Sequence, residues 1–377
     1  MKVLHVITGL GIGGAEQQLR LLLRHLPTRS EVVTLANPGA VALGIEADGT
    51  PVTHLGMTGN RDLGALPRLA RIVRQGRYDL VHTHLYRACV YGRTAARLAG
   101  VRRVIATEHS LGETQIEGRP LSAGTRALYL ASERLGTSTV AVSPSVARRL
   151  TDWGVPPDRI RIVPNGIETG RFAFDARARR LTRGVLGIPE DAYVVGGVGR
   201  LAPGKRFDRL VRAVASVPEA RLLLVGEGEH RAELLRIARE CGAADRILLF
   251  GACEDPPAVA PLGPTLPELL SAMDVFVSTS PDEAFGLAIV EALAAGLPVL
   301  YVACPAIDDL PPDAAPGARR IGESVPELIS ALRGIQGARL ARLPLPEAAR
   351  RYDIAHSARQ LMSLYDQAVH GTPSSAK

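Results

Sequence analysis

Two glutamates, Glu283 and Glu291, flank a short apolar stretch of the chain. An ionised carboxylate accepts several hydrogen bonds and donates none, so a pair of them suits the paired hydroxyls of a sugar or a ribose. The backbone amides of Phe285, Gly286 and Leu287 lie where a helix is expected to begin. Such amides lack intrahelical acceptors and carry partial positive charge. Together these features predict a site for a polyhydroxylated or anionic ligand.

These groups need a strand before them and a helix after them. The apolar run 274–280 predicts a buried parallel strand, and Pro281 and Asp282 would end it. The apolar segment 287–295 predicts the helix, and the glycine that precedes it would let a ligand approach the backbone closely. Glu283 therefore falls in the loop and Glu291 on the helix.

The same alternation of strands and helices runs through the whole chain. The expected strands are 3–7, 31–36, 79–83, 103–107 and 138–142 in the first half, and 193–198, 221–225, 247–250, 275–280 and 298–302 in the second. The expected helices are 15–26, 64–75, 87–98, 124–136, 207–216, 229–241, 266–273, 287–295 and 355–369. Repeated strand–helix units predict an α/β protein with two doubly wound parallel sheets, and the charge-rich stretch 168–183 is the expected hinge. Ligands of such sheets bind at the carboxyl ends of the strands, so we expect a cleft between the two domains.

Lys205 stands alone in the interior of the sequence, because the only other lysines are Lys2 and Lys377. It follows the first strand of the second half, together with Arg200. A compact ammonium group is a point charge that suits a diphosphate, whereas a planar guanidinium differs in shape. This pair predicts a phosphate site, with an ordinary solvated surface loop as the alternative.

The glycine-rich segment 9–14 follows the first strand and formally satisfies the dinucleotide pattern G-x-G-x-x-G. An NAD-dependent oxidoreductase is therefore a rival interpretation. That fingerprint also requires an acidic residue at the end of the second strand to hold the ribose, and Asn37 lies there instead. Glycines that only allow tight strand-to-helix packing are a third interpretation.

Three histidines lie at expected strand ends. His82 and His84 alternate on one strand, and His109 follows the next strand, beside Glu108. Alternating histidines could begin a metal site, but no third ligand is evident from the sequence, so we expect no metal. Packing at the strand end is the alternative for His82 and His84.

Composition narrows the class of protein. Hydrophobic residues make up 46% and charged residues 22% of the chain, and no apolar run approaches the ~20 residues of a membrane span. The net charge of +7 raises nucleic acid as a partner, yet aromatic residues are only 4% and no nucleic-acid motif occurs, so we expect none. The four cysteines show no C-x-x-C pair, which indicates reduced thiols and a cytoplasmic protein. The arginine-rich first half leaves peripheral contact with the inner face of a membrane open.

The loop Ser-Pro-x-Glu-x-Phe-Gly-Leu (280–287) and the segment Glu-Ala-x-Ala-x-Gly-x-Pro-Val (291–299) resemble the donor-site signature of the retaining glycosyltransferases of family 4. The resemblance covers nearly the whole chain. It implies the GT-B fold, with two facing Rossmann-like domains and a cleft between them. The expected boundaries are 1–170 for an acceptor-binding domain, 171–350 for a nucleotide-sugar domain, and 351–377 for a helix that crosses back to the first domain.

The resemblance also implies roles for individual residues. His109, Arg200, Lys205 and Glu283 match catalytic positions, of which Arg200 and Lys205 would neutralise the diphosphate and His109 would lie near the transferred sugar. The implied donor-binding set is Gly13, Gly14, Arg200, Lys205, Gly251, Leu270, Glu283, Ala284, Phe285, Gly286, Leu287 and Glu291. The insertion 254–257 and the segment 300–309 depart from the family pattern, which leaves base and sugar identity open.

The expected activity is metal-independent, retaining transfer of a sugar from a nucleoside diphosphate sugar, UDP in preference to GDP, to an unknown hydroxyl acceptor. The product would belong to glycan, glycolipid or natural-product biosynthesis, and no cofactor is expected beyond the donor. A nucleotide-sugar epimerase, a pseudo-glycosyltransferase and a non-catalytic subunit that binds sugar nucleotides stay open on the same fold. Oligomeric state and acceptor identity are not encoded in any motif.

Overall fold

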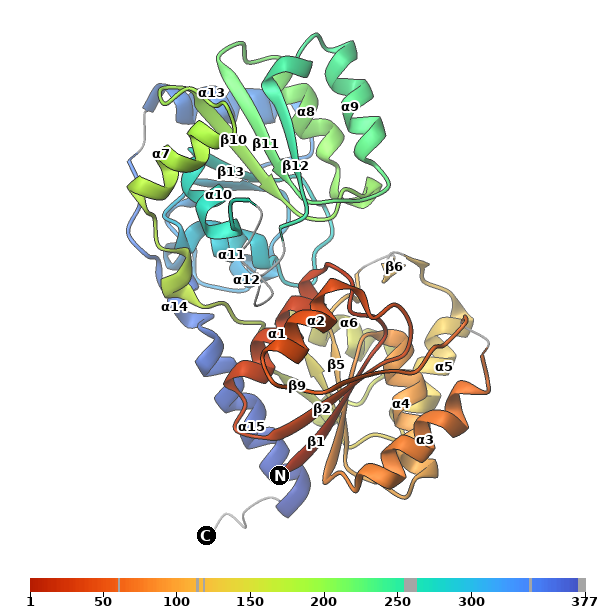
Figure 1. Cartoon of the computed structure of the whole chain (residues 1–377). Helices are drawn as coiled ribbons and strands as arrows, with labels where there is room; N and C mark the ends of the chain where they lie inside the picture. The colour runs from red at the N-terminus through yellow and green to blue at the C-terminus, as the bar shows by residue number, and fades with distance from the viewer. Residues whose placement is uncertain (60–61, 113–114, 118, 254–262, 339–340, 372–377) are drawn as a thin grey trace. The chain divides into compact units, whose positions relative to one another are not determined.

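The chain folds into two compact units, each built on its own parallel sheet (Figure 1). The computed structural model describes residues 1–59, 62–112, 115–117, 119–253, 263–338 and 341–371. Unit 1 comprises 1–166 and 354–377, and unit 2 comprises 167–353. The chain therefore leaves unit 1 once and returns to it with its last helix.

Unit 1 contains a seven-stranded sheet in the order β3-β2-β1-β4-β5-β8-β9, with all neighbouring strands parallel. Its strands are β1 (Lys2–Ile7), β2 (Arg29–Thr34), β3 (Val52–His54), β4 (Leu80–His84), β5 (Val104–Glu108), β8 (Ser138–Ala141) and β9 (Ile160–Ile162), with a small hairpin of β6 (Gln115–Ile116) and β7 (Arg119–Pro120). Its helices are α1 (Gly14–His25), α2 (Gly39–Ala47), α3 (Ala65–Gly76), α4 (Tyr86–Leu98), α5 (Ala123–Glu133), α6 (Pro144–Trp153) and α15 (Ile354–His370), with one 3-10 turn, η1 (Pro157–Arg159).

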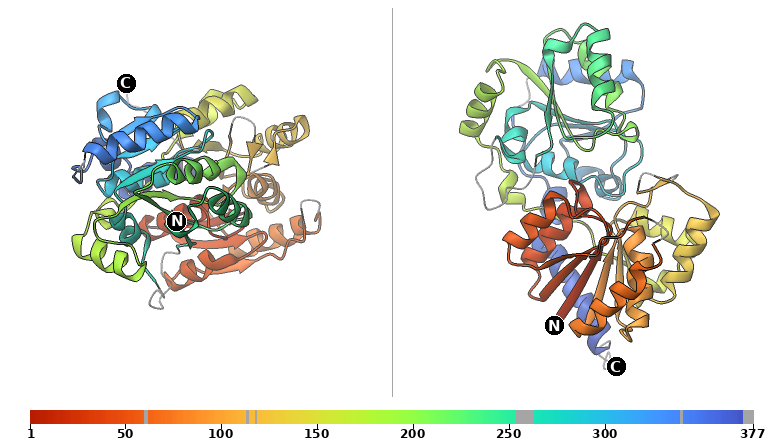
Figure 2. Two further views of the ribbon diagram at one scale, coloured as in Figure 1. Left: turned by 90° about the horizontal axis from the view of Figure 1, so that it is seen from above. Right: turned by 45° about the vertical axis from the view of Figure 1, so that its right-hand side comes forward.

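Helices cover both faces of this sheet, because consecutive residues of β1, β4 and β5 are buried and successive residues of a strand point to opposite faces. Leu4 and Val6 of β1 pack with α3 and α4, whereas Val3 packs with the apolar stripe of α15 around Tyr365. Figures 1 and 2 show α15 along one face and α3 and α4 along the other. The C-terminal helix is thus part of the core of unit 1.

Unit 2 contains a six-stranded parallel sheet in the order β12-β11-β10-β13-β14-β15. Its strands are β10 (Tyr193–Val198), β11 (Ala220–Val225), β12 (Ile247–Gly251), β13 (Val275–Ser278), β14 (Val299–Tyr301) and β15 (Ala318–Arg320). Its helices are α7 (Ala176–Val185), α8 (Phe207–Ala215), α9 (Arg231–Glu240), α10 (Leu266–Ala272), α11 (Leu287–Ala294), α12 (Pro305–Asp308), α13 (Val325–Ala338) and α14 (Glu347–Arg351), with 3-10 turns η2 (Thr169–Phe172), η3 (Pro203–Lys205), η4 (Ala244–Arg246) and η5 (Pro312–Ala314).

Each sheet reverses its strand order at one place. In unit 1 the reversal lies between β1 and β4, and in unit 2 it lies between β10 and β13. Loops at the carboxyl ends of two such strands diverge to opposite faces, which leaves room for a ligand between them. The glycine-rich segment follows β1, Lys205 follows β10 and Glu283 follows β13, whereas His82 and His84 lie at the end of β4 itself.

The sequence predicted the α/β class and the doubly wound parallel sheets, and the structure confirms both. Several short elements were missed: β3, β9, α2, α6 and most of the segment after β14. These elements carry few periods of their own hydrophobic pattern. Their positions depend on pairing with strands already in the sheet.

The prediction of a hinge at 168–183 is wrong, because this stretch forms η2 and α7 within unit 2. Two of its arginines are held in ion pairs and are not solvated linker charges. Arg179 Nη2 and Arg183 Nη2 donate to the two carboxylate oxygens of Asp274 at 2.6 and 2.9 Å, and Arg183 is fully buried. The ion pairs anchor α7 beside the start of β13.

Within the described residues, no helix combines the length and the apolar character needed to cross a membrane.

Candidate functional site

The loop after β10 brings Lys205 to the carboxyl edge of the sheet in unit 2. The loop ends in η3, and the Lys205 amide donates to the Ala202 carbonyl at 3.0 Å. From the neighbouring strand end, the Thr279 hydroxyl donates to the Lys205 carbonyl at 2.8 Å. This bond ties the β10 loop to the β13 loop, so the lysine is held where the strand order reverses.

Lys205 Nζ forms an ion pair with Glu283 Oε1. The two residues are 78 positions apart in sequence and come from the two loops that flank the reversal point. Their side chains are 32% and 16% exposed, so a ligand could reach both groups. The sequence predicts separate partners for them, a diphosphate for Lys205 and a sugar for Glu283, whereas the structure joins them in one charged pair.

The start of α11 lies directly after Glu283. Gly286 precedes the helix with a φ of 99°, a left-handed conformation that favours glycine. The first amide that bonds within the helix is that of Ile289, which donates to the Gly286 carbonyl at 3.0 Å. The amides of Leu287 and Ala288 precede it and have no intrahelical acceptor. A cation, a carboxylate and a helix N-terminus therefore share one loop cluster.

Cys304 and Ala306 hold the backbone of this loop cluster in place through the Phe285 carbonyl. The Cys304 thiol donates to the Phe285 carbonyl at 3.4 Å, and the Ala306 amide donates to the same carbonyl at 2.9 Å. A Cβ atom at Gly286 would lie 2.6 Å from Cys304 Sγ. The close contact and the positive φ both require glycine at this position.

Replacing Gly286 by alanine is expected to lower the free energy of unfolding by about 1–3 kcal/mol, because it combines left-handed strain with the collision at Cys304. Chemical denaturation measures this change. The double variant Gly286→Ala/Cys304→Ala should recover the steric part only. Gly184→Ala is the matched control, since it lies on an exposed face of α7 with no heavy atom within 4 Å of the added Cβ. An equal loss of stability in Gly286→Ala and Gly184→Ala would contradict a specific requirement for glycine at position 286.

Tyr352 supports the same loop, although nothing in the sequence predicted a role for it. Its ring meets the Phe285 ring edge-on, with centroids 4.9 Å apart, and its hydroxyl donates to the Ala306 carbonyl at 2.8 Å. No local motif surrounds this tyrosine, so only the fold reveals its contact. Tyr352 therefore links the end of unit 2 to the start of α11.

Replacing Tyr352 by phenylalanine is expected to cost about 1 kcal/mol of stability, because the buried Ala306 carbonyl loses its donor while the ring contact with Phe285 is kept. Thermal unfolding checks this. Unchanged stability would show that the hydroxyl contributes nothing at this place.

Most of the other site residues predicted in unit 2 lie at loops or helix starts beside the sheet, and one lies in the core. Ala284 and Glu291 lie in the same loop and on the first turns of α11, both partly exposed, and Arg200 is exposed directly after β10. Gly251 ends β12 and accepts a hydrogen bond from the Gly226 amide at 2.6 Å. Leu270 differs, because its side chain is fully buried in α10 and belongs to the core of the unit. The insertion 254–257 lies outside the described residues.

In unit 1 the glycine-rich loop packs against the end of β2. The Leu10 amide donates to the Asn37 carbonyl at 2.9 Å, in the region where a dinucleotide enzyme needs a carboxylate. Gly13 caps α1 with extended backbone and Gly14 begins the helix, where a side chain at Gly13 would collide with the Glu16 carboxylate. The loop geometry thus gives no support to ribose binding by an acid at β2.

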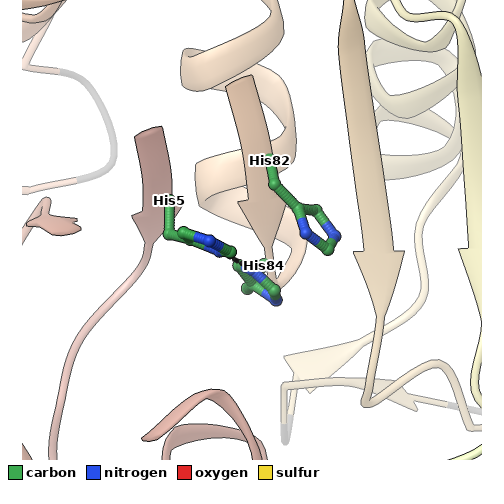
Figure 3. Close-up of side chains that lie close together, drawn as sticks. All are labelled: His5, His82 and His84. Atoms are coloured by element: carbon green, nitrogen blue, oxygen red, sulfur yellow. Dashed lines mark hydrogen bonds between the residues drawn. The ribbon is translucent and has the colours of Figure 1, made fainter. Parts of the chain in front are cut away.

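The histidines of unit 1 form a cluster that the sequence showed only in part. The structure adds His5 of β1, which brings one nitrogen within 4.8 Å of nitrogens from His82 and His84 (Figure 3). No third ligand is evident from the sequence because β1 and β4 are far apart along the chain but adjacent in the sheet. Three neutral imidazoles could ligate a metal such as zinc.

Hydrogen bonds already occupy much of this cluster. His82 Nδ1 lies 2.5 Å from the Tyr365 hydroxyl, and His82 Nε2 lies 2.7 Å from Thr107 Oγ1. His5 Nδ1 lies 3.1 Å from His84 Nε2, and His84 Nδ1 lies 3.2 Å from His109 Nε2. Burial lowers the pKa of His5 to about 3 and that of His109 to about 4, so these rings are neutral at pH 7.

Glu108 does not contribute to this cluster, although it precedes His109. Its carboxyl group points to the opposite face of the sheet, where Cys89 Sγ lies 3.8 Å from Oε1. Burial raises the pKa of Glu108 to about 8, which indicates a protonated acid at neutral pH. Although Glu108 and His109 are neighbours in the sequence, their side chains therefore lie in different environments.

Both halves of the chain match known glycosyltransferase profiles. Residues 12–171 match the profile described as Glycosyltransferase Family 4, and residues 178–318 match Glycosyl transferases group 1. The solved structure of Anabaena HepE with UDP and glucose is similar to this chain at 23% identity and a TM-score of 0.83, covering 97% of this chain and 100% of that one. This likeness shows the GT-B fold.

Three curated relatives illustrate the range of similar proteins. A UDP-Gal:α-D-GlcNAc-diphosphoundecaprenol α-1,3-galactosyltransferase of Escherichia coli is 28% identical over 64% of this chain and 62% of its own. A D-inositol 3-phosphate glycosyltransferase of Xylanimonas cellulosilytica is 30% identical over 79% and 74%. A GDP-mannose-dependent α-mannosyltransferase of Mycobacterium tuberculosis is 34% identical over 62% and 57%.

The chain thus spans about three fifths of the length of the E. coli relative. The two profile matches together extend over most of the chain, and the Xylanimonas relative, at 30% identity, is covered over 74% of its own length. The chain belongs to family 4 of the glycosyltransferases.

Proposed function

We propose that this chain transfers a sugar from a nucleoside diphosphate donor to a hydroxyl of an acceptor, with retention of the anomeric configuration. The observation that carries this proposal is the Lys205–Glu283 ion pair beside the start of α11. A cation there can meet a phosphate, and a carboxylate can meet sugar hydroxyls. Unit 2 would hold the donor, and unit 1 would hold the acceptor.

Each group has a distinct role in this proposal. Arg200 and Lys205 stabilise the negative charge that develops on the departing diphosphate. Glu291 accepts hydrogen bonds from the ribose hydroxyls. Glu283 and the amides at the start of α11 orient the transferred sugar.

The proposed step breaks the bond between the anomeric carbon and the phosphate oxygen, and the electron pair stays with the diphosphate. The acceptor oxygen bonds to the anomeric carbon on the same face, and its proton passes to the departing phosphate oxygen. No metal ion or further cofactor is required in this scheme. Full activity after treatment with EDTA is the expected result.

UDP is the proposed nucleotide. The similarity to the HepE complex favours UDP, whereas the mycobacterial relative uses GDP-mannose. We propose a cytoplasmic site of action, and peripheral contact with a membrane depends on the acceptor. An epimerase or pseudo-glycosyltransferase would use the same phosphate site, and a non-catalytic subunit would bind the donor without turnover.

The first test is calorimetric binding of UDP, GDP, ADP and dTDP to the purified chain. Tight binding of one nucleotide supports the donor site and selects the sugar nucleotides for an acceptor screen. NMR of the product then gives the anomeric configuration, and an inverted product overturns the retaining scheme. Release of UDP without a glycoside supports the epimerase or pseudo-glycosyltransferase alternative, and preference for NAD overturns the transferase proposal.

A further inference from the structure

The short helix α12, which follows β14, holds the backbone that leads into α11. The two helices lie beside each other in unit 2 (Figure 1). The first residue of α12 is Pro305, which has no N–H group, so the Ala306 amide is the first donor that this helix offers. The Ala306 amide and the Cys304 thiol both donate to the Phe285 carbonyl, at 2.9 and 3.4 Å. One carbonyl therefore receives two donors from the start of α12.

The Cys304 thiol can act as a donor because it keeps its hydrogen. Its side chain is fully buried. Burial raises the pKa of the thiol well above its usual value, and the carboxylates of Glu283 and Asp308 act in the same direction. The sulfur is therefore an S–H group at neutral pH, and the Phe285 carbonyl is its acceptor.

Asp308 gives α12 its shape. A single helical turn is not stable by itself, so other groups must close it. The Asp308 carboxylate accepts from the Cys304 amide at 2.9 Å and from the Tyr301 hydroxyl at 3.1 Å. The Asp308 amide donates to the Cys304 carbonyl at 2.8 Å, so the turn is closed by two bonds. Because Tyr301 is the last residue of β14, these bonds also fasten α12 to the sheet.

The peptide bond between Phe285 and Gly286 converts this anchoring into a direction. The bond is trans, and the C=O and N–H groups of a trans peptide point to opposite sides. Since the Phe285 carbonyl faces Cys304 and Ala306, the Gly286 N–H group points away from α12. Gly286 is partly exposed, and its amide has no acceptor among the residues that the structure describes.

We propose that Cys304 and Asp308 are positioning residues that aim the Gly286 amide at the sugar of the donor. This amide then joins those of Leu287 and Ala288, which lack intrahelical acceptors, as a donor to a sugar hydroxyl. The anchoring belongs to the segment 300–309, which departs from the family pattern, so the resemblance does not imply it. The identity of the ligand rests on the proposed function, whereas the direction of the amide does not.

The direction of the amide is tested first in the full chain without ligand. The sequence contains two Phe-Gly pairs, Phe250–Gly251 and Phe285–Gly286. A chain labelled with ¹³C at phenylalanine carbonyls and ¹⁵N at glycine therefore gives two signals in a carbonyl–amide NMR correlation, and Phe250→Leu assigns them by removing one. The expected result is a Gly286 amide that exchanges its hydrogen rapidly with water. Slow exchange of this amide would overturn the proposal.

Substitutions then test which groups set the direction. Cys304→Ala removes one donor to the Phe285 carbonyl and should shift its ¹³C signal, whereas Cys304→Ser keeps a donor and should move the signal back. Asp308→Asn should shift the same signal. Asp313→Asn is the matched control, because it makes the same change at an exposed residue of η5, and it should leave the signal in place, as should every variant for Phe250. An unmoved Phe285 signal in both Cys304→Ala and Asp308→Asn contradicts the positioning role, and if neither variant folds, the exchange rate in the wild type decides.

Binding affinities separate positioning from packing. Calorimetry compares UDP-glucose with UDP, which lacks the sugar. Cys304→Ala should weaken the binding of UDP-glucose about tenfold, the effect of one lost hydrogen bond, and leave UDP unchanged. Cys304→Ser should restore the affinity for UDP-glucose. Equal weakening of both ligands would indicate general damage to unit 2 and overturn the proposal.

The last arm follows the Gly286 amide when ligand is added to the wild type. UDP-glucose should slow its exchange with water, and UDP alone should not. Binding of UDP-glucose without any change at Gly286 overturns the contact with the sugar. A wild type that binds neither ligand would refute the proposed UDP donor, whereas the carbonyl shifts and the exchange rate would still decide the direction of the amide.

Discussion

Replacing Lys205 by alanine is expected to weaken nucleoside diphosphate binding about 10- to 100-fold, the effect of losing a hydrogen bond to a charged group. Because charge on the diphosphate grows as the sugar leaves, the loss in kcat should be larger, about 100- to 1,000-fold. Calorimetry measures the first quantity, and steady-state kinetics with the best donor measures the second. Stability should change little, since the Lys205–Glu283 pair is partly exposed.

Arg209→Gln is the matched control for this prediction. Arg209 also lies in the segment after β10 and pairs with a carboxylate, Glu323, at 2.7 Å, but on α8 rather than in the loop cluster. Its loss removes one positive charge from the same unit. Equal weakening in both variants would point to a general charge effect and against a specific phosphate contact.

The variant Lys205→Arg tests whether the compact shape of the ammonium group matters for phosphate binding. Arginine keeps the charge but presents a planar fork in place of a compact ammonium group. We expect partial binding and reduced turnover. Full activity of Lys205→Arg would refute the point-charge explanation for the lone internal lysine.

The second large effect is a maximum of stability near pH 6.5. Burial lowers the pKa of His5 to about 3 and of His109 to about 4, and it lowers the pKa values of His82 and His84 well below 6.5. Between the folded and unfolded pKa values the unfolded chain binds more protons, so stability rises with pH up to about 6.5. It is lost as the pH falls towards 4 and 3, by up to about 1.4 kcal/mol per pH unit for each imidazole.

Glu108 has the opposite effect. Burial raises its pKa to about 8, so the folded chain binds more protons between the unfolded value of 4.5 and pH 8. Its contribution is fully present below pH 4.5 and is lost as the pH rises through 8. Below pH 6.5 the several imidazoles outweigh this single carboxyl group, whereas above pH 6.5 Glu108 is the one of these five groups whose protonation still differs between the folded and unfolded chain.

Denaturant unfolding of the wild type from pH 4.5 to 8.5 measures this profile. Glu108→Gln should flatten the decline above pH 6.5, because an amide stays neutral. His5→Phe should reduce the slope below pH 6.5, and His54→Gln on the exposed β3 should leave it unchanged. A profile without slope on either side would show that these groups titrate equally in the folded and unfolded chain.

The sequence by itself determined the alternation of strands and helices along the chain and the position of the motifs relative to them. Hydrophobic runs and helical periodicity are local, so strands such as β1 and β10 and helices such as α4 and α11 were found close to their observed bounds. Turn residues are local as well, so Gly286 was correctly placed at the start of α11. The same reasoning put Lys205 and Glu283 in loops at strand ends.

Only the tertiary structure decided which of these loops meet. Lys205 and Glu283 are 78 residues apart, and His5 and His84 are 79 apart, yet β10 pairs with β13 and β1 pairs with β4. Tyr365 reaches His82 across 283 residues of chain. Strand order and helix docking minimise the apolar surface that a whole unit exposes to water. A short stretch of sequence does not determine this total, because it depends on all the elements of the unit. For this reason the charged pair, the support from Tyr352 and the cluster of His5, His82 and His84 could be seen only in the folded protein.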